Sequence, residues 1–244
     1  MNKFFKMENL MRLYDEMNAK YDIVPFRKQT KPGQVILRHD IDVDVKKAFD
    51  LAVIERMLGI HSTYFVLLSA PYNVWYKKNK MFLKAIYGFG HEIGLHFDPS
   101  IYSLKNSMIE NIWKEKRVLE DVLGTKIYSV SIHNYSKHKN QCLVPDMINA
   151  YDPKLFNDET YWSDSRGIIK KDIYKVLEKT KEGKTVQILM HPIYYSDEGY
   201  SYETLFDESV LEYALSLYEE YRINKIYDKE IDIEDIIRRY GQHE

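Results

Sequence analysis

The segment Val35-Ile36-Leu37-Arg38-His39-Asp40-Ile41-Asp42 decides the fold expected for this sequence. An apolar run suited to a buried strand ends on two carboxylates, Asp40 and Asp42. Residues two apart in a strand face the same side, so both carboxylates can reach one pocket. Capping of a helix that begins near Val45 is the alternative role, but Asp44 is better placed to cap it. The segment therefore predicts a strand whose carboxyl end serves a site.

Four further segments end in the same way, with a short apolar or β-rich run that stops at a histidine or an aspartate. They cover residues 92–96, 128–133, 161–164 and 186–191. If all of these runs are parallel strands, their acids and imidazoles converge on one rim of the sheet. That rim is where α/β barrels and open α/β sheets place their chemistry.

Apolar patterns with the helical and strand periods alternate along the rest of the chain. They predict strands near 34–39, 62–68, 92–96, 128–133, 161–164, 186–191 and 223–227. They predict helices near 45–58, 76–88, 104–123, 170–180 and 206–222, after an amphipathic helix in the first 20 residues. Roughly seven strands in βα order favour an α/β fold with a mostly parallel sheet, which can close into a barrel.

The bulk composition excludes several classes of protein. The 244 residues suit one domain over 1–244, with residues 1–30 as an N-terminal helical extension. A formal net charge of −2 gives no nucleic-acid footprint. The one cysteine, Cys142, cannot build a disulfide framework. No Walker, GxGxxG, CxxC or GxSxG motif occurs, which argues against nucleotide, redox and serine-hydrolase sites.

The apolar segments also bear on location. Charged residues interrupt the N-terminal apolar run too early for a secretory signal. No apolar stretch approaches the roughly 20 residues of a membrane span. We therefore expect a cytoplasmic protein without a membrane span, whose substrate is available there. The sequence does not indicate an oligomeric state.

Imidazoles and carboxylates at one rim are typical of a divalent-metal hydrolase. His96 is a natural zinc or cobalt ligand, with a hydrogen-bonded core histidine as the alternative. His133 and His191 each suit either a ligand or a proton donor. Asp164 can hydrogen-bond the second ring nitrogen of a histidine and raise its basicity, or it can be a turn residue within 163–167.

The strand period also assigns the residues that precede Asp40. Arg38 is expected to share the pocket face with Asp40 and to pair with a carboxylate. His39 lies between them and is expected to face away from the pocket. The pocket face is therefore predicted to carry the positively charged Arg38 guanidinium beside the carboxylates.

Several of these stretches resemble motifs of the polysaccharide deacetylase superfamily, the metal-dependent carbohydrate esterases of family four that include chitin and peptidoglycan deacetylases. Residues 38–42 resemble its aspartate motif, 59–65 its G-x-x-x-T-x-F strand, and 90–96 its G-H-E-I-G-x-H metal strand. Residues 186–191 resemble its late strand, which ends in a catalytic histidine. The resemblance covers about residues 34–192 and implies a distorted seven-stranded (β/α) barrel, in agreement with the strand count.

The resemblance also implies a role for each matching residue. Asp40 resembles the catalytic base, and Asp42 the metal-binding aspartate. His96 resembles the first metal histidine. His191 resembles the general acid, and Asp164 the aspartate that orients it.

The sequence departs from the family pattern in two places. The family's second metal histidine lies four residues after the first, where this chain has Ser100. Its arginine-proline motif is replaced by residues 131–134, Ser-Ile-His-Asn. We expect His133 to supply the missing ligand, with Asp98 as the rival.

The implied activity is removal of an N-acyl group, in the first place N-acetyl, from an amino sugar. The cofactor is a divalent metal, with zinc preferred and cobalt, nickel, manganese or iron as alternatives. A cytoplasmic location favours a small-molecule substrate, either a nucleotide-linked or a lipid-linked intermediate of surface-glycan biosynthesis. The alternatives are a metal hydrolase of another C–N or phosphoester bond and an inactive carbohydrate-binding relative.

Overall fold

The computed structural model describes residues 3–102, 107–137, 143–222 and 238. The chain forms two compact units, Met1–Ser201 and Tyr202–Glu244. The second unit contains helix α6 (Tyr202–Arg222), which confirms the helix predicted at 206–222. The strand predicted at 223–227 and Cys142 lie outside the described residues. Among the described helices, none has the length and apolar character of a membrane span.

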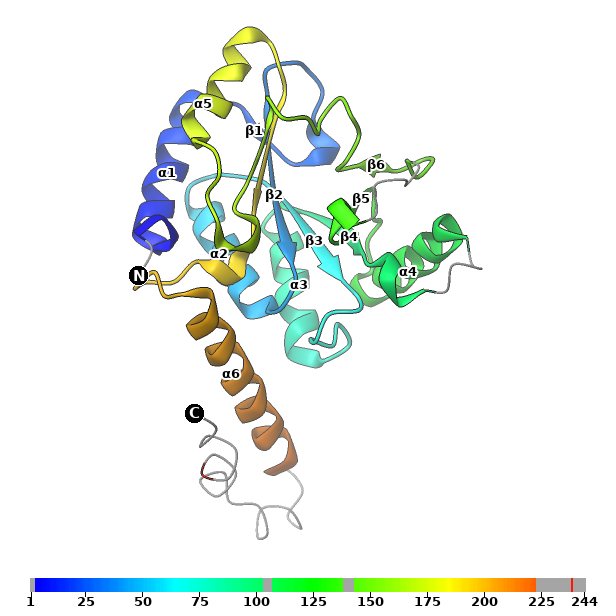
Figure 1. The fold of residues 1–244 in the computed structure, drawn as a ribbon. Coiled ribbons are helices and arrows are strands. Elements are labelled where there is room, and N and C mark those ends of the chain that lie inside the picture. The colour runs from blue at the N-terminus through cyan, green and yellow to red at the C-terminus, as the bar shows by residue number, and fades with distance from the viewer. Residues whose placement is uncertain (1–2, 103–106, 138–142, 223–237, 239–244) are drawn as a thin grey trace. The chain divides into compact units, whose positions relative to one another are not determined.

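The first unit is built on a parallel sheet with strand order β6-β5-β4-β3-β2-β8-β7, and β1 pairs with β2 at its side. Figure 1 labels strands β1 to β6. The strands are β1 (Ile23–Val24), β2 (Val35–Ile41), β3 (Thr63–Leu67), β4 (Glu92–Phe97), β5 (Ser129–Ile132), β6 (Ile148–Asn149), β7 (Tyr161–Ser163) and β8 (Val186–Met190). No pairing within the described ranges joins β6 to β7, so the barrel is open there. This confirms the predicted distorted, mostly parallel barrel with seven strands in its path.

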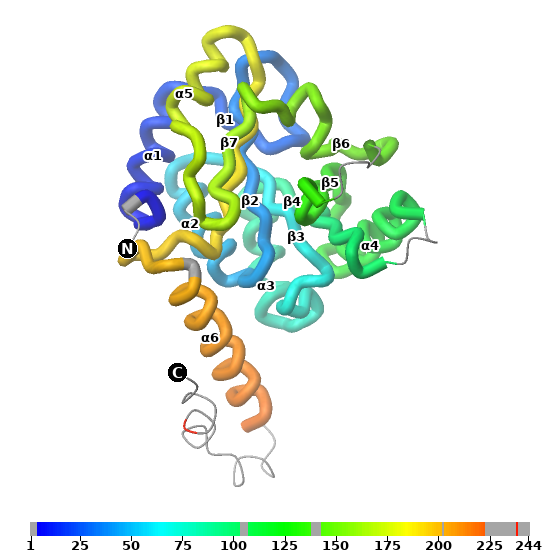
Figure 2. The backbone as a smooth tube through the Cα atoms, viewed as in Figure 1, coloured from blue at the N-terminus to red at the C-terminus, as the bar shows by residue number. Residues whose placement is uncertain are grey.

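The helices of this unit are α1 (Met7–Lys20), α2 (Val45–Met57), α3 (Lys77–Gly88), α4 (Met108–Leu123) and α5 (Ile173–Leu177). The chain passes from β2, β3 and β4 into α2, α3 and α4, and α2 and α3 lie behind the sheet in Figure 1. Helices α1 and α5, which are far apart in the sequence, lie side by side (Figure 2), and the Tyr174 hydroxyl donates to Glu16 at 3.2 Å. The helix predicted at 170–180 is shorter than expected, because a 3-10 segment, Glu178–Glu182, follows α5.

Local capping groups set the ends of the helices. The Asp44 carboxylate accepts hydrogen bonds from the amides of Lys46 and Lys47 at the start of α2. Gly124 ends α4 in the left-handed conformation, with φ 71°, which glycine adopts without steric cost. Because Asp44 caps α2, the carboxylates of Asp40 and Asp42 are available for the site.

Two short strands, β1 and β6, are not predicted by the sequence pattern. Each has two residues, which is too short for an alternating pattern to be visible. Six of the seven predicted strands are present among the described residues, and β6 completes the path.

The central position of β2 explains the uninterrupted apolar run with which it begins. Strand β2 lies between β3 and β8, and all seven of its residues are buried. Parallel strands covered on both faces are typically rich in branched apolar residues. Three polar residues, Arg38, His39 and Asp40, are nevertheless buried in this strand. Buried polar groups are costly unless they are paired, so their partners are informative about function.

Candidate active site

The six predicted site residues gather at the carboxyl edge of the parallel sheet. They end or follow five strands: Asp40 and Asp42 at β2, His96 at β4, His133 at β5, Asp164 at β7, and His191 at β8. The parallel register explains this, since Leu67 of β3 pairs with His96, and His39 of β2 pairs with Met190, the last residue of β8. The fold therefore brings together side chains from distant parts of the chain.

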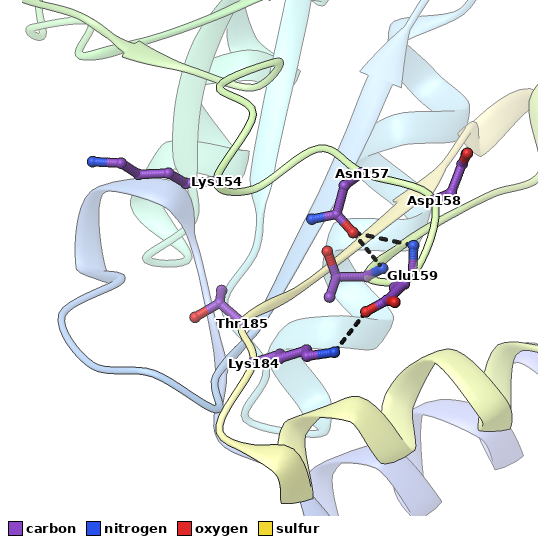
Figure 3. A pocket seen from close by; sticks show the side chains of 7 residues that line it. Lys154, Asn157, Asp158, Glu159, Lys184 and Thr185 are labelled. Carbon is purple, nitrogen blue, oxygen red and sulfur yellow. Dashed lines mark hydrogen bonds and ion pairs between the residues drawn. The ribbon is translucent and has the colours of Figure 1, made fainter.

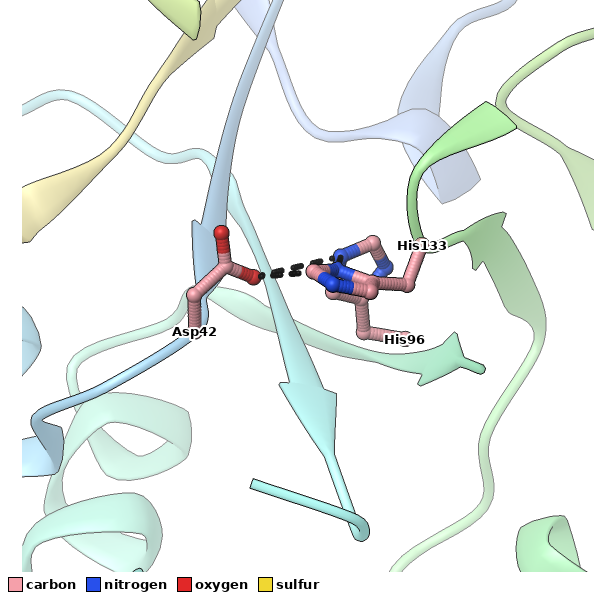
Figure 4. Close-up of side chains that lie close together, drawn as sticks. All are labelled: Asp42, His96 and His133. Atoms are coloured by element: carbon pink, nitrogen blue, oxygen red, sulfur yellow. Dashed lines mark hydrogen bonds and ion pairs between the residues drawn. The ribbon is translucent and has the colours of Figure 1, made fainter. Parts of the chain in front are cut away.

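Asp42, His96 and His133 form a group whose ligand atoms lie within 4.8 Å of one another (Figure 4). The Oδ1 atom of Asp42 is 3.3 Å from Nε2 of His96 and 3.6 Å from Nδ1 of His133. The two ring nitrogens are 3.2 Å apart. This is a possible Asp/His/His metal site.

The hydrogen bond on the far side of His96 orients its ring. Its Nδ1 atom lies 3.1 Å from the carbonyl oxygen of Ser131. A carbonyl only accepts, so Nδ1 carries a proton and Nε2 is the nitrogen that faces Asp42 and His133. Metal-binding histidines commonly have such a partner on their second nitrogen.

Two buried carboxylate oxygens test whether these residues fit a metal ion. Oδ1 of Asp40 has no hydrogen-bond partner among the described residues, and Oδ1 of Asp42 has only its contacts with the two imidazoles, at 3.3 Å and 3.6 Å. Buried polar atoms without a partner are uncommon and costly, and a cation near them would satisfy both. Two imidazoles and a carboxylate are also the kind of three-residue set that leaves a coordination position open on zinc. The residues present therefore fit a divalent metal.

The two histidines of this group favour the ionised form of Asp42, which is the form that binds a metal ion. Burial raises the pKa of its carboxyl group, but His133 and His96 outweigh burial and hold the pKa far below its usual range. The contact with Asp42 raises the pKa of His133. Asp42 is thus ionised at neutral pH.

Asp40 lies beside this group and is held by a buried arginine. An Arg38 Nη atom donates to Oδ2 of Asp40 at 3.0 Å, as the sequence analysis predicts. The guanidinium also donates to the Gln187 side chain at 2.9 Å and to the Tyr151 hydroxyl at 3.0 Å. Arg38 therefore fixes one oxygen of Asp40, whereas Oδ1 is buried and has no hydrogen-bond partner among the described residues.

His191 and Asp164 form a second pair at the edge of the site. The Nδ1 atom of His191 donates to Asp164 at 2.6 Å, and its Nε2 atom is 3.8 Å from Oδ2 of Asp42. The Asp164 carboxylate also accepts from the His191 amide at 3.0 Å and from the Tyr195 hydroxyl at 3.1 Å. Burial lowers the pKa of His191, but Asp164 outweighs it and raises the pKa to about 9. The imidazole is thus protonated at neutral pH, and its Nε2–H is directed toward Asp42.

We expect Asp164→Asn to lower the pKa of His191, because asparagine lacks the charge that raises it. Without the Asp164 charge, His191 loses its proton at lower pH. The basic limb of the pH–rate profile is therefore expected to shift to lower pH. Tyr195→Phe removes a hydrogen bond to the same carboxylate but keeps its charge, and is expected to shift the pKa less. The NMR chemical shifts of the His191 ring, followed against pH, give its pKa in each variant. An unchanged His191 pKa in Asp164→Asn would contradict this assignment.

Asp98, the rival metal ligand, does not belong to the group of Asp42, His96 and His133. Its side chain caps the 3-10 turn Pro99–Ile101 by accepting from the Ser100 amide at 2.8 Å. Sequence reasoning did not identify Tyr151, Gln187 and Tyr195 as partners of the site residues. Each contacts a residue remote in sequence, so no local pattern marks it.

A separate hollow lies at the opposite edge of the sheet (Figure 3). It has a volume of about 500 Å³, and its lining includes Thr160 and Thr185. These residues precede β7 and β8, whereas Asp164 and His191 follow the same strands. The hollow is therefore distinct from the candidate site.

Solved structures similar to this chain include carbohydrate deacetylases. The chitin deacetylase of the fungal pathogen Colletotrichum lindemuthianum is 15% identical, with 78% of this chain and 86% of that chain covered and a TM-score of 0.43. Peptidoglycan deacetylase PdaC from Bacillus subtilis is 16% identical, with 84% and 98% covered and a TM-score of 0.43. A CE4 family pseudoenzyme from Bacillus anthracis is 14% identical, with a TM-score of 0.42, and this chain spans 62% of its length. No protein-family model and no curated protein matches the chain.

Proposed function

We propose that this protein is a metal-dependent carbohydrate N-deacetylase. One observation carries the proposal: a proton acceptor, Asp40, and a proton donor, His191, flank the group formed by Asp42, His96 and His133. A purely structural cluster has little need of both. The motif resemblance to the polysaccharide deacetylase superfamily supplies the substrate class.

Asp42, His96 and His133 would hold the metal, with zinc preferred because two imidazoles and one carboxylate suit it. When bound, a divalent metal supplies Lewis acidity toward the amide carbonyl and makes water a stronger nucleophile. These three side chains orient the reaction but exchange no proton with the substrate.

The protein's own groups move the protons. Oδ1 of Asp40, which Arg38 leaves available, accepts a proton from the attacking water. The C–N bond of the amide then breaks, and Nε2–H of His191 donates a proton to the departing amine nitrogen. The products are the carboxylic acid and the free amino sugar. Asp164 steadies His191 throughout through the bond to Nδ1.

For the substrate we propose an N-acetylated amino sugar in a nucleotide-linked or lipid-linked intermediate of surface-glycan biosynthesis. The motif resemblance supports the amino sugar, and the expected cytoplasmic location supports a carrier-linked intermediate.

Incubation of the zinc-loaded protein with N-acetylated sugars, free and carrier-linked, tests the function. We expect equal amounts of acetate and new amine, loss of both after chelation, and recovery when zinc is restored. Asp42→Ala is the control, since it removes a metal ligand and leaves Asp40 and His191 in place. Release of phosphate without acetate would support a phosphoester hydrolase, and sugar binding without any product would support an inactive relative.

A further inference from the structure

A buried polar network lies on the opposite side of β2 from Asp40. His39 points away from the pocket, as its position between Arg38 and Asp40 predicts, and meets Glu55 of α2. His39 and Glu55 both have 0% of their surface exposed. Neither residue belongs to the metal group or to the pair formed by Asp40 and His191. The burial of His39 and Glu55 therefore requires another explanation.

Two contacts hold the His39 ring in place. Nε2 is 2.7 Å from a Glu55 carboxylate oxygen, and Nδ1 is 3.1 Å from the carbonyl oxygen of Met190. Both partners are oxygen atoms that accept hydrogen bonds, so the His39 ring bridges the side chain of Glu55 and the backbone of Met190. Glu55 is ionised, because His39 outweighs the effect of burial and lowers the pKa of Glu55 to about 2.

The strand register connects this pair to the site. His39 and Met190 are direct partners in the pairing of β2 with β8. The next residue on β2 is Asp40, and the residue after Met190 is His191. The His39 ring thus connects α2, β2 and the end of β8. Its two strand contacts lie one residue before Asp40, the proposed proton acceptor, and one residue before His191, the proposed proton donor.

Stability alone is a poor reason for this arrangement. Burying an ion pair costs desolvation, and well-packed apolar residues are often as stable or more stable in its place. Glu55 is nevertheless fully provided with donors, since the Ser62 and Tyr64 hydroxyls lie 2.6 Å and 2.9 Å from its carboxylate. A satisfied buried network of this kind specifies one arrangement of its elements.

We propose that His39, held by Glu55, is a positioning residue that fixes the end of β8 against β2 and thereby sets the separation of Asp40 and His191. The catalytic part of this inference rests on the proposed function. The contact with the Met190 carbonyl is the decisive one, because it acts on the backbone next to His191.

Two substitutions at His39 separate its contacts. In His39→Asn the amide nitrogen takes the place of Nδ1 and keeps the bond to Met190, whereas in His39→Gln it takes the place of Nε2 and keeps the bond to Glu55. We expect His39→Gln to lower kcat by roughly 10²-fold with little change in KM, since small displacements of reacting groups have such effects. His39→Asn is expected to keep more of kcat, although it too loses stability.

Tyr64→Phe is the matched control, because it removes one hydrogen bond to Glu55 and leaves both contacts of His39. It is expected to keep kcat despite a lower melting temperature. Equal losses of kcat in His39→Gln, His39→Asn and Tyr64→Phe would show a merely structural role and overturn the proposal.

Hydrogen exchange tests positioning without using activity. We expect the amides of residues 188–195 to exchange faster in His39→Gln than in His39→Asn, with no local change in Tyr64→Phe. Exchange that rises equally in both His39 variants, or evenly over all strands, would overturn the proposal. If the wild-type protein releases no acetate, the proposed function fails while the exchange data still decide whether His39 positions β8.

Discussion

Asp40→Asn should lower turnover by roughly 10²–10⁴-fold, the usual contribution of a general base. Asparagine keeps the shape of the side chain and an oxygen for Arg38, but it cannot take a proton from water. Zinc binding should persist, because Asp42, His96 and His133 are unchanged. Steady-state kinetics and elemental analysis of the same preparation measure the two quantities.

Asp44→Asn is the matched control for this substitution. It makes the same chemical change four residues along the chain, at the helix cap, where asparagine serves as well as aspartate. Turnover should therefore be close to that of the wild type. If Asp40→Asn also retained full turnover, Asp40 would not be the base, and the proposed mechanism would be wrong.

His133→Ala should remove bound zinc. The metal group has three members among the described residues, and two ligands alone would hold the ion weakly. We expect the loss of affinity to exceed the roughly 10–100-fold that follows removal of an outer hydrogen-bond partner. Zinc titration by calorimetry, with elemental analysis of the purified variant, measures this loss.

Asp98→Ala distinguishes the rival ligand. Because Asp98 caps a turn and is not in the metal group, its removal should leave zinc affinity nearly unchanged. Full zinc occupancy in His133→Ala together with loss of zinc in Asp98→Ala would make Asp98, and not His133, the third metal ligand.

Local patterns in the sequence were sufficient for much of the fold and for part of the site. The apolar run that opens β2 predicts a buried parallel strand, because strands covered on both faces are typically rich in branched apolar residues. The strand period correctly assigns Arg38 to the face of Asp40 and His39 to the opposite face, since successive side chains alternate. Asp44 is recognisable as a cap because capping is an interaction with the next few residues.

The tertiary structure decided everything that depends on residues far apart in the chain. His133 rather than Asp98 joins Asp42 and His96, because the Asp98 side chain is committed to its own turn while the end of β5 lies beside β4. The two-residue strands β1 and β6 exist only through pairing with longer neighbours.

The hydrogen bonds of His39 to Glu55 and Met190 likewise depend on packing between distant elements, which no local pattern records. The sequence by itself determined which side chains stand at strand ends, because that follows from periodicity and burial along a short segment. Which of them meet, at what distance and in which protonation state, follows from strand order and register, and these are properties of the folded chain as a whole.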